Sequence, residues 1–199
     1  MTPDVVLLNS GGSNYTSLQA AFERLGARCG QSTDPARIRA ASHVVLPGVG
    51  SAASAMQAIA GNGLFDVIRT LQQPLLGICL GMQVLFEHSS ESDIACLGLI
   101  PGRVTRLQGS PGIRVPHMGW NAVQSCRSHP LLAGLDGSDF YFVHSYAAMP
   151  SDASIALCGY GQDFSAAVAS GNVLGVQFHP ERSGPQGQRL LANFLELAA

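Results

Sequence analysis

Charged residues are scarce in this chain. Only 12% of its 199 residues are Asp, Glu, Lys or Arg, about half of the usual share. The 11 basic and 13 acidic residues give a formal net charge of −2, and no basic cluster of the kind that follows a phosphate backbone is present. Nucleic-acid binding is therefore not expected. The low charge and the mean hydropathy of +0.20 fit a large apolar core and a surface partly covered by a partner.

Three further features are missing. No apolar stretch approaches the roughly 18 residues of a membrane span. The N-terminal sequence MTPDVVLLNSGG has no basic region, so no signal peptide is predicted. The five cysteines are widely spaced and form no C-x-x-C pair, which favours free thiols in a reducing cytoplasm over disulfides or a zinc site. No other spacing suggests metal ligands, and neither a metal nor a cofactor is expected.

Strand-like and helix-like segments alternate in the first half, which predicts a parallel sheet with helices on both faces. The second half reads mainly as strands separated by Gly, Asp, Asn and Ser, followed by a last amphipathic helix. No linker or repeat interrupts the chain, so we expect one α/β domain over residues 1–199 with a mixed sheet. The expected strands are 4–8, 43–47, 74–79, 115–123, 139–149, 154–160, 164–170 and 172–179; the expected helices are 13–26, 36–41, 51–60, 64–72, 80–89 and 187–199.

A cysteine stands between two glycines in PLLGICLGMQ, residues 74–83. A strand that runs through Gly-x-Cys-x-Gly into a helix is the cysteine form of a nucleophile elbow. Gly77 and Gly81 would remove Cβ atoms that clash in the sharp turn. Cys79 would then project at the carboxyl end of the sheet, where such folds bind ligands. The alternative is a structural cysteine in a βα turn, as we expect for the other four.

A thiol nucleophile needs a base, and the base needs a group that orients it. His179 and Glu181 lie two residues apart in GVQFHPE, so an extended chain points both the same way. His179 could therefore face Cys79 while Glu181 holds its other nitrogen. His144 in YFVHSY is the rival base, but it has no acid two residues away and is expected to line the pocket.

An oxyanion produced by attack on a carbonyl needs hydrogen-bond donors. The backbone N–H of Leu80, directly after the cysteine, is one candidate. PGVG, residues 47–50, supplies the other, because its glycine-rich turn ends a strand that would lie beside the elbow. The peptide between Val49 and Gly50 is the expected second donor, although such turns also end many ordinary strands.

PGVG, GICLGMQ and HPE, in this order, resemble the class I (triad) glutamine amidotransferases. PHMGWN (116–121), FYFVHSY (140–146) and GVQFHPERSG (175–184) narrow the resemblance to the glutaminase subunits of imidazole glycerol phosphate synthase. The match begins near residue 4 and reaches the end of the chain. It implies a flavodoxin-like amidotransferase domain and an enzyme of histidine biosynthesis. The first loop departs from the family pattern, with Asn9, Ser13 and Tyr15 at places where the family often has other residues.

The resemblance implies roles for individual residues. Cys79 would attack the carboxamide of L-glutamine, His179 oriented by Glu181 would move the proton, and a cysteinyl thioester would form and be hydrolysed. Ammonia would pass to a second active site on a (β/α)8-barrel cyclase subunit, in a heterodimer that makes imidazole glycerol phosphate and AICAR. The residues expected to bind the substrate are Gln83, Gly50, His144, Ser145 and Tyr146; those expected at the partner interface are Asn14, Trp120, Tyr141 and Arg182.

Other interpretations share the same motifs. The chain could serve a different amidotransferase, such as that of vitamin B6 synthesis, but PHMGWN and the short length oppose this. It could be a stand-alone cysteine hydrolase, in which case it would be active without a partner. A non-enzymatic interaction module is disfavoured because all three triad residues are present.

Overall fold

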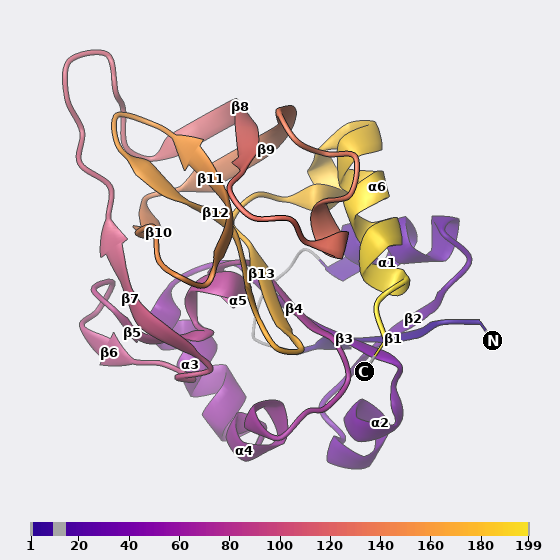
Figure 1. The fold of residues 1–199 in the computed structure, drawn as a ribbon. Helices are drawn as coiled ribbons and strands as arrows, with labels where there is room; N and C mark the ends of the chain where they lie inside the picture. The colour runs from indigo at the N-terminus through magenta and orange to yellow at the C-terminus, as the bar shows by residue number, and fades with distance from the viewer. Residues whose placement is uncertain (1, 10–14, 199) are drawn as a thin grey trace.

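The computed structural model describes residues 2–9 and 15–198. A nine-stranded sheet runs through the molecule, with a smaller four-stranded sheet beside it (Figure 1). In spatial order the large sheet consists of β2 (Arg28–Ser32), β1 (Asp4–Leu8), β3 (His43–Gly48), β4 (Leu75–Cys79), β13 (Val173–Val176), β12 (Asp163–Ser170), β11 (Ser154–Gly159), β8 (His117–Ser125) and β9 (Ser138–His144).

Parallel pairing joins β2, β1, β3, β4 and β13. These strands are apolar because both of their faces are covered. On β1, Val5 and Leu7 enter one core cluster, while Val6 and Leu8 enter the other. The carboxyl ends of β3 and β4 lie side by side, with Gly48 paired to Cys79. This register brings PGVG against the cysteine turn, as the sequence predicts.

Helices cover both faces of the parallel part (Figure 1). On one face lie α1 (Tyr15–Arg24) and α6 (Gly184–Leu195), whose Phe22 and Phe194 rings are 6.3 Å apart. On the other face lie α2 (Pro35–Ala40), α3 (Ala52–Gly61) and α4 (Phe65–Arg69). Asp34 caps α2 by accepting a hydrogen bond from the Ala36 amide at 3.0 Å, and Pro35 follows it as predicted.

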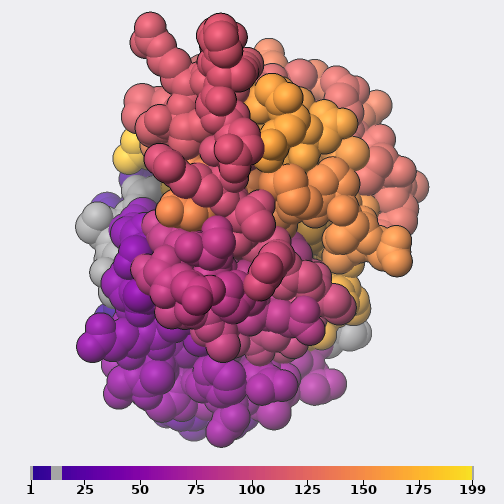
Figure 2. Space-filling view, turned by 90° about the vertical axis from the view of Figure 1, so that its left-hand side faces the viewer, coloured from indigo at the N-terminus to yellow at the C-terminus, as the bar shows by residue number. Residues whose placement is uncertain are grey.

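The remaining strands are mainly antiparallel. β12, β11, β8 and β9 extend the large sheet, so the prediction of a mixed sheet flanked by helices is confirmed. The second sheet has the order β10 (Tyr146–Ala148), β7 (Ile100–Arg106), β5 (Phe86–Ser89) and β6 (Ile94–Ala95). Residues 107–116, between β7 and β8, project from the body of the molecule (Figures 1 and 2).

Two expected elements are wrong. The predicted helix 80–89 ends after one turn, as α5 (Leu80–Gln83), and continues into β5. Phe86 is buried against Ile100 of β7, so sheet pairing overrides the helical pattern. The predicted strand 139–149 is two strands, β9 and β10, which belong to different sheets. The chain changes sheets at Ser145, beside the site described below.

Several absences hold for the described residues. None of their helices is long and apolar enough to cross a membrane. No group of His, Cys, Asp or Glu side chains among them could hold a metal ion. All five cysteines are free thiols, and burial raises the pKa of Cys29 and Cys158 to about 12 and that of Cys96 to about 11. Cys96 and Cys158 are buried and Cys29 is half-buried, and thiols with a raised pKa are less reactive, which is consistent with a structural role for these three.

Candidate active site

Cys79 occupies a strained turn between β4 and α5. Its φ and ψ angles are 54° and −112°, a region that side-chain-bearing residues rarely adopt. The cysteine is the residue before the first turn of α5, and the Leu80 amide follows it. This geometry is that of the nucleophile elbow predicted from the sequence.

The glycines around Cys79 are required by close backbone contacts. A Cβ on Gly77 would lie 2.7 Å from the Gly81 oxygen, and one on Gly81 would overlap the Leu46 carbonyl. Gly48 is equally confined, because its Cβ would meet Leu80 at 2.7 Å. These distances are shorter than any van der Waals contact, so β3, β4 and α5 can approach only without side chains here. The elbow is therefore fixed by its own packing.

His179 and Glu181 lie on a short 3₁₀ turn, η2 (Pro180–Arg182), after β13. The imidazole Nδ1 is 2.9 Å from Glu181 Oε1, and the carboxylate is fully buried. Burial alone lowers the pKa of His179, but its hydrogen bonds and charge interactions with Cys79 and Glu181 outweigh this and raise the pKa to about 10. A protonated imidazole beside a sulfur atom stabilises the thiolate form. The structure thus brings the three predicted triad residues together.

Two further groups contact the sulfur atom. The Val143 carbonyl oxygen lies 3.9 Å from Cys79 Sγ, and Gln177 Nε2 lies 3.7 Å from it. Gln177 is fully buried and its oxygen accepts a hydrogen bond from Gln83 Nε2 at 3.0 Å. The thiol therefore has an acceptor and a donor within reach besides His179. Gln177 is not among the residues predicted from the sequence, although it lies in the same GVQFHPE stretch as His179.

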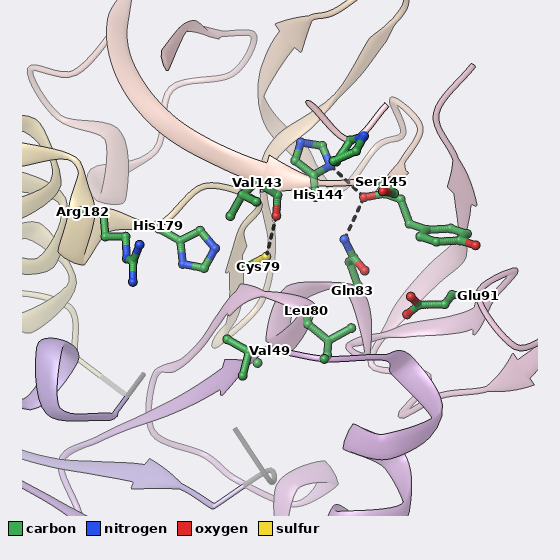
Figure 3. Close-up of a pocket in the computed structure, with 14 residues that line it drawn as sticks. Val49, Cys79, Leu80, Gln83, Glu91, Val143, His144, Ser145, His179 and Arg182 are labelled. Atoms are coloured by element: carbon green, nitrogen blue, oxygen red, sulfur yellow. Dashed lines mark hydrogen bonds between the residues drawn. The ribbon is translucent and has the colours of Figure 1, made fainter. Parts of the chain in front are cut away.

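A cavity of about 510 Å³ opens above Cys79 (Figure 3). His179 lies on one side of the cysteine, while Gln83 and Glu91 lie on the other. The chain segments that line the cavity come from β3, α5, the β5–β6 turn, the end of β9 and η2. The lining residues that were predicted for the catalytic, oxyanion or substrate site are Val49, Gly50, Cys79, Leu80, Gln83, His144, Ser145, Tyr146 and His179. Arg182, which was predicted at the partner interface, also lines the cavity, and the remaining lining residues are Gly48, Glu91, Pro116 and Val143.

The segment 47–50, here called the oxyanion segment, forms one wall of this cavity. Val49 and Gly50 are exposed, unlike the buried elbow they face. Gly50 has φ +97°, and among the described residues a Cβ there would meet the Ser54 Oγ at 3.2 Å. That close contact is with a side chain that can move, whereas the contacts at the elbow are with backbone. Together with the Leu80 amide, the Val49–Gly50 peptide provides the two backbone groups predicted to face an oxyanion.

His144 is a wall residue whose ring atoms are already engaged. Its Nδ1 is 2.8 Å from the Tyr146 carbonyl oxygen, and its Nε2 is 3.2 Å from His117 Nδ1. Burial, followed by the charges of His117 and His179, lowers the pKa of His144 to about 3. A neutral ring held by these two partners is poorly suited to take a proton from Cys79, which agrees with the choice of His179 as base.

Gln83 and Glu91 form the polar end of the cavity. Gln83 is buried, and its amide donates a hydrogen bond to the Tyr146 carbonyl at 2.8 Å. Glu91 is the acidic side chain among the described lining residues. Glu91 is not among the residues predicted from the sequence, because one acidic residue in the turn SSESD carries no distinguishing pattern.

An apolar surface adjoins the cavity. Met118 and Trp120 on β8 are 64% and 57% exposed, which excludes a core position for Trp120. Trp120 pairs with Tyr141 of β9, and the two rings lie 6.1 Å apart, edge to face. Together Met118, Trp120 and Tyr141 define what we call the β8–β9 face. Asn14, the remaining predicted interface residue, lies outside the described residues.

The family model of the class-I glutamine amidotransferases matches residues 6–198. The chain belongs to this family. Among curated proteins it is 50% identical over 197 residues to the imidazole glycerol phosphate synthase subunit HisH of Xylella fastidiosa, covering 98% of both chains. It is 51% identical over 194 residues to HisH 2 of Legionella pneumophila, covering 97% of this chain and 98% of that one. Within the family, the chain therefore groups with the HisH subunits.

Solved structures agree on the fold. A crystal structure of a glutamine amidotransferase superposes with a TM-score of 0.75 at 20% identity, over 96% of this chain and 97% of that one. The structure of PurLQS from Thermotoga maritima gives a TM-score of 0.71 at 21% identity, over 98% of both chains. The family and fold predicted from the sequence motifs are confirmed.

Proposed function

We propose that this amidotransferase is the glutaminase subunit of an imidazole glycerol phosphate synthase, and that residues 1–199 form its single catalytic domain. The observation that carries the proposal is the arrangement of Cys79, His179 and Glu181 at one end of a cavity large enough for an amino acid. Identity of about one half to HisH subunits over nearly the whole chain supports the assignment to histidine biosynthesis.

In the first half-reaction Cys79 is the nucleophile. Its sulfur attacks the carboxamide carbon of L-glutamine, and the oxygen becomes an oxyanion. The Leu80 amide and the Val49–Gly50 peptide N–H stabilise this charge. His179 donates its proton to the departing nitrogen, so ammonia leaves and a γ-glutamyl thioester remains.

In the second half-reaction water replaces ammonia. His179, now neutral, takes a proton from the attacking water, and Glu181 stabilises the imidazolium that results. The thioester breaks and glutamate leaves, which restores the thiolate of Cys79 beside the protonated imidazole of His179. Each half-reaction passes through an oxyanion at the same place, so both need the donors of the oxyanion segment.

The polar ends of glutamine fit the polar groups of the cavity. The negative charge of Glu91 suits the α-ammonium group. Gln83, fixed by Tyr146 and Gln177, presents its side chain at the same end of the cavity. The backbone of Gly50 and of His144, Ser145 and Tyr146 completes the substrate site in this proposal.

The ammonia formed has to reach an acceptor before it is protonated in bulk water. We assign the β8–β9 face to the contact with a (β/α)8-barrel cyclase subunit, because Met118 and Trp120 are exposed beside the half-buried Tyr141, and Trp, Tyr and Met are typical of interface centres. Arg182, which lines the cavity, and Asn14 remain predicted contacts.

A glutaminase assay with and without the cyclase subunit tests the proposal. We expect little release of glutamate by the chain alone, and glutamine-dependent synthesis of imidazole glycerol phosphate by the pair. A chain equally active in both conditions would be a stand-alone hydrolase. A chain inactive with this cyclase but activated by the partner of another amidotransferase would belong to a different pathway.

A further inference from the structure

Glu91 is held at the tip of the β5–β6 turn. Its backbone amide donates a hydrogen bond to Ser89 Oγ at 3.2 Å, and Ser89 is fully buried. His88 Nε2 and Asp93 Oδ1, 3.0 Å apart, close the base of the same turn. The second sheet therefore presents Glu91 at a defined place on the cavity wall.

The Glu91 carboxylate also accepts a hydrogen bond from a backbone amide in a distant part of the chain. Its Oε2 accepts a hydrogen bond from the Ala52 amide at 2.7 Å. Ala52 is the first residue of α3, and the first amides of a helix have no partner within the helix. An ionised acceptor at this position forms a short, strong hydrogen bond and interacts favourably with the helix dipole.

Ala52 lies two residues after Gly50, the last residue of the oxyanion segment. Between them, Ser51 caps α3 by a reciprocal pair of hydrogen bonds with Ser54, at 3.1 and 3.2 Å. The downstream end of the oxyanion segment is thus fastened by the cap and by Glu91. The cap joins Ser51 to Ser54 within the first turn of α3. Glu91 instead joins the start of α3 to the β5–β6 turn, on the other side of the cavity.

We infer that Glu91 is a positioning residue whose single carboxylate joins the substrate's α-ammonium group to the oxyanion segment. The inference rests on the proposed glutaminase function. One carboxylate that binds both groups fixes the distance between the ammonium end of the substrate and the Val49–Gly50 peptide. An amide that carries an α-ammonium group is then placed with its carbonyl at the oxyanion donors.

Two substrates separate the two tasks of Glu91. L-Glutamine carries the α-ammonium group, and glutaramate is the same amide without it. Ammonia release from each is measured in the complex with the cyclase subunit, with enzyme in excess for the slower substrate. The variants are Glu91→Gln, which keeps an oxygen acceptor for Ala52 but loses the charge, and Glu91→Ala, which loses both.

With glutamine, both variants should raise KM, by about 30-fold or more, because a charge pair to the ammonium group is lost. With glutaramate, Glu91→Ala should lower kcat about tenfold, since the oxyanion donor is no longer held in place. Glu91→Gln should lower the glutaramate kcat less than Glu91→Ala does, because the amide oxygen can still accept a hydrogen bond from Ala52 although the charge is lost. Unchanged glutaramate turnover by Glu91→Ala would overturn the inference and leave Glu91 as a binding residue only.

Glu87 offers a matched control. It is an exposed glutamate on β5 whose Oε2 accepts a hydrogen bond from the Gly102 amide at 2.9 Å, away from the cavity. Glu87→Ala should change neither substrate's kinetics. Hydrogen exchange provides a second measurement: Glu91→Ala should speed exchange in residues 50–54, and Glu87→Ala should not. Equal exchange in the two variants would also contradict the inference.

The measurements distinguish a failure of the proposed function from a failure of this inference. If the original chain with its cyclase released ammonia from neither amide, the glutaminase assignment would be wrong. The exchange measurement would still decide whether Glu91 holds the start of α3.

Discussion

The two walls that meet over Cys79 are built in opposite ways. The elbow of β4 and α5 is buried and so closely packed that no Cβ fits at Gly77 or Gly81. The oxyanion segment opposite it is exposed at Val49 and Gly50, and a Cβ on Gly50 would meet the Ser54 side chain rather than backbone. The nucleophile is thus held in a strained conformation by backbone contacts, whereas we expect the exposed Val49–Gly50 peptide to be able to rotate.

This difference suggests a division of labour. A fixed nucleophile with its base and acid is ready for chemistry at all times. A donor that can turn toward or away from the oxyanion can control the rate, since one such donor is worth about 10²–10³-fold. A glutaminase that should not waste glutamine would gain from this arrangement. The alternative is that PGVG is only a tight turn into α3.

The largest expected effect comes from removing the fixed nucleophile. Cys79→Ala should abolish glutamine hydrolysis, by at least about 10⁴-fold, while leaving the fold and partner binding nearly unchanged. In the assembled complex, synthesis from added ammonium salts should continue, because we propose that the cyclase site lies on the other subunit. Residual glutamine turnover, or loss of the ammonium-dependent reaction, would contradict this assignment.

The next effect distinguishes the two histidines of the cavity. His179→Asn should lower kcat by about 10²–10⁴-fold, the range for a general base. His144→Asn should lower it considerably less, because His144 faces Tyr146 and His117. Circular dichroism of both variants is the control, and we expect it to show that they are folded. The reverse ranking would transfer the base role to His144.

Alanine at two glycines contrasts the walls directly. Gly81→Ala should destabilise the fold by about 3 kcal/mol or more, since its Cβ has to displace the Leu46 backbone. Gly50→Ala should cost about 1–2 kcal/mol, the strain of a positive φ. Urea unfolding measures both. Equal costs would show that the oxyanion segment is packed as tightly as the elbow.

The last prediction concerns the pH dependence of the unfolding free energy that arises from His117 and His144, whose ring nitrogens lie 3.2 Å apart. Burial lowers the pKa of His117 to about 4 and that of His144 to about 3. Both residues therefore take up protons on unfolding below about pH 6.5, and stability should fall as the pH falls from there. Each contributes a slope of about 1.4 kcal/mol per pH unit.

His117→Phe isolates one of these protons, because Phe keeps the stacking on Tyr160, 3.9 Å away between ring centres. The slope of unfolding free energy between pH 6.5 and 5 should decrease by about 1.4 kcal/mol per unit. The same slope in both proteins would mean that His117 is already protonated in the folded chain over this range.

The sequence predicts the elbow well because its constraint is local. Two glycines around a cysteine, after a buried strand, leave few other conformations. His179 and Glu181 lie together as predicted, but a 3₁₀ turn brings them together rather than the extended chain on which the prediction rested. Recognising the family adds the substrate and partner, which no local pattern contains.

The errors arise where distant pairing decides. Residues 84–89 look helical from their spacing, but Phe86 pairs with Ile100, 14 residues further along the chain and beyond the reach of helical periodicity. Glu91 is inconspicuous for the same reason. Its role depends on Ala52, 39 residues away, and on the second sheet that carries it there.

The steady-state kinetics of glutamine hydrolysis test the central claim, a fixed nucleophile beside an adjustable oxyanion donor. The parameters are compared among the free glutaminase, its complex with the cyclase, and the complex with the cyclase's ligand. We expect kcat to rise by about 10²–10³-fold over this series while KM changes little, because the donor acts on the transition state. A free glutaminase that is already as fast as the liganded complex would contradict the account.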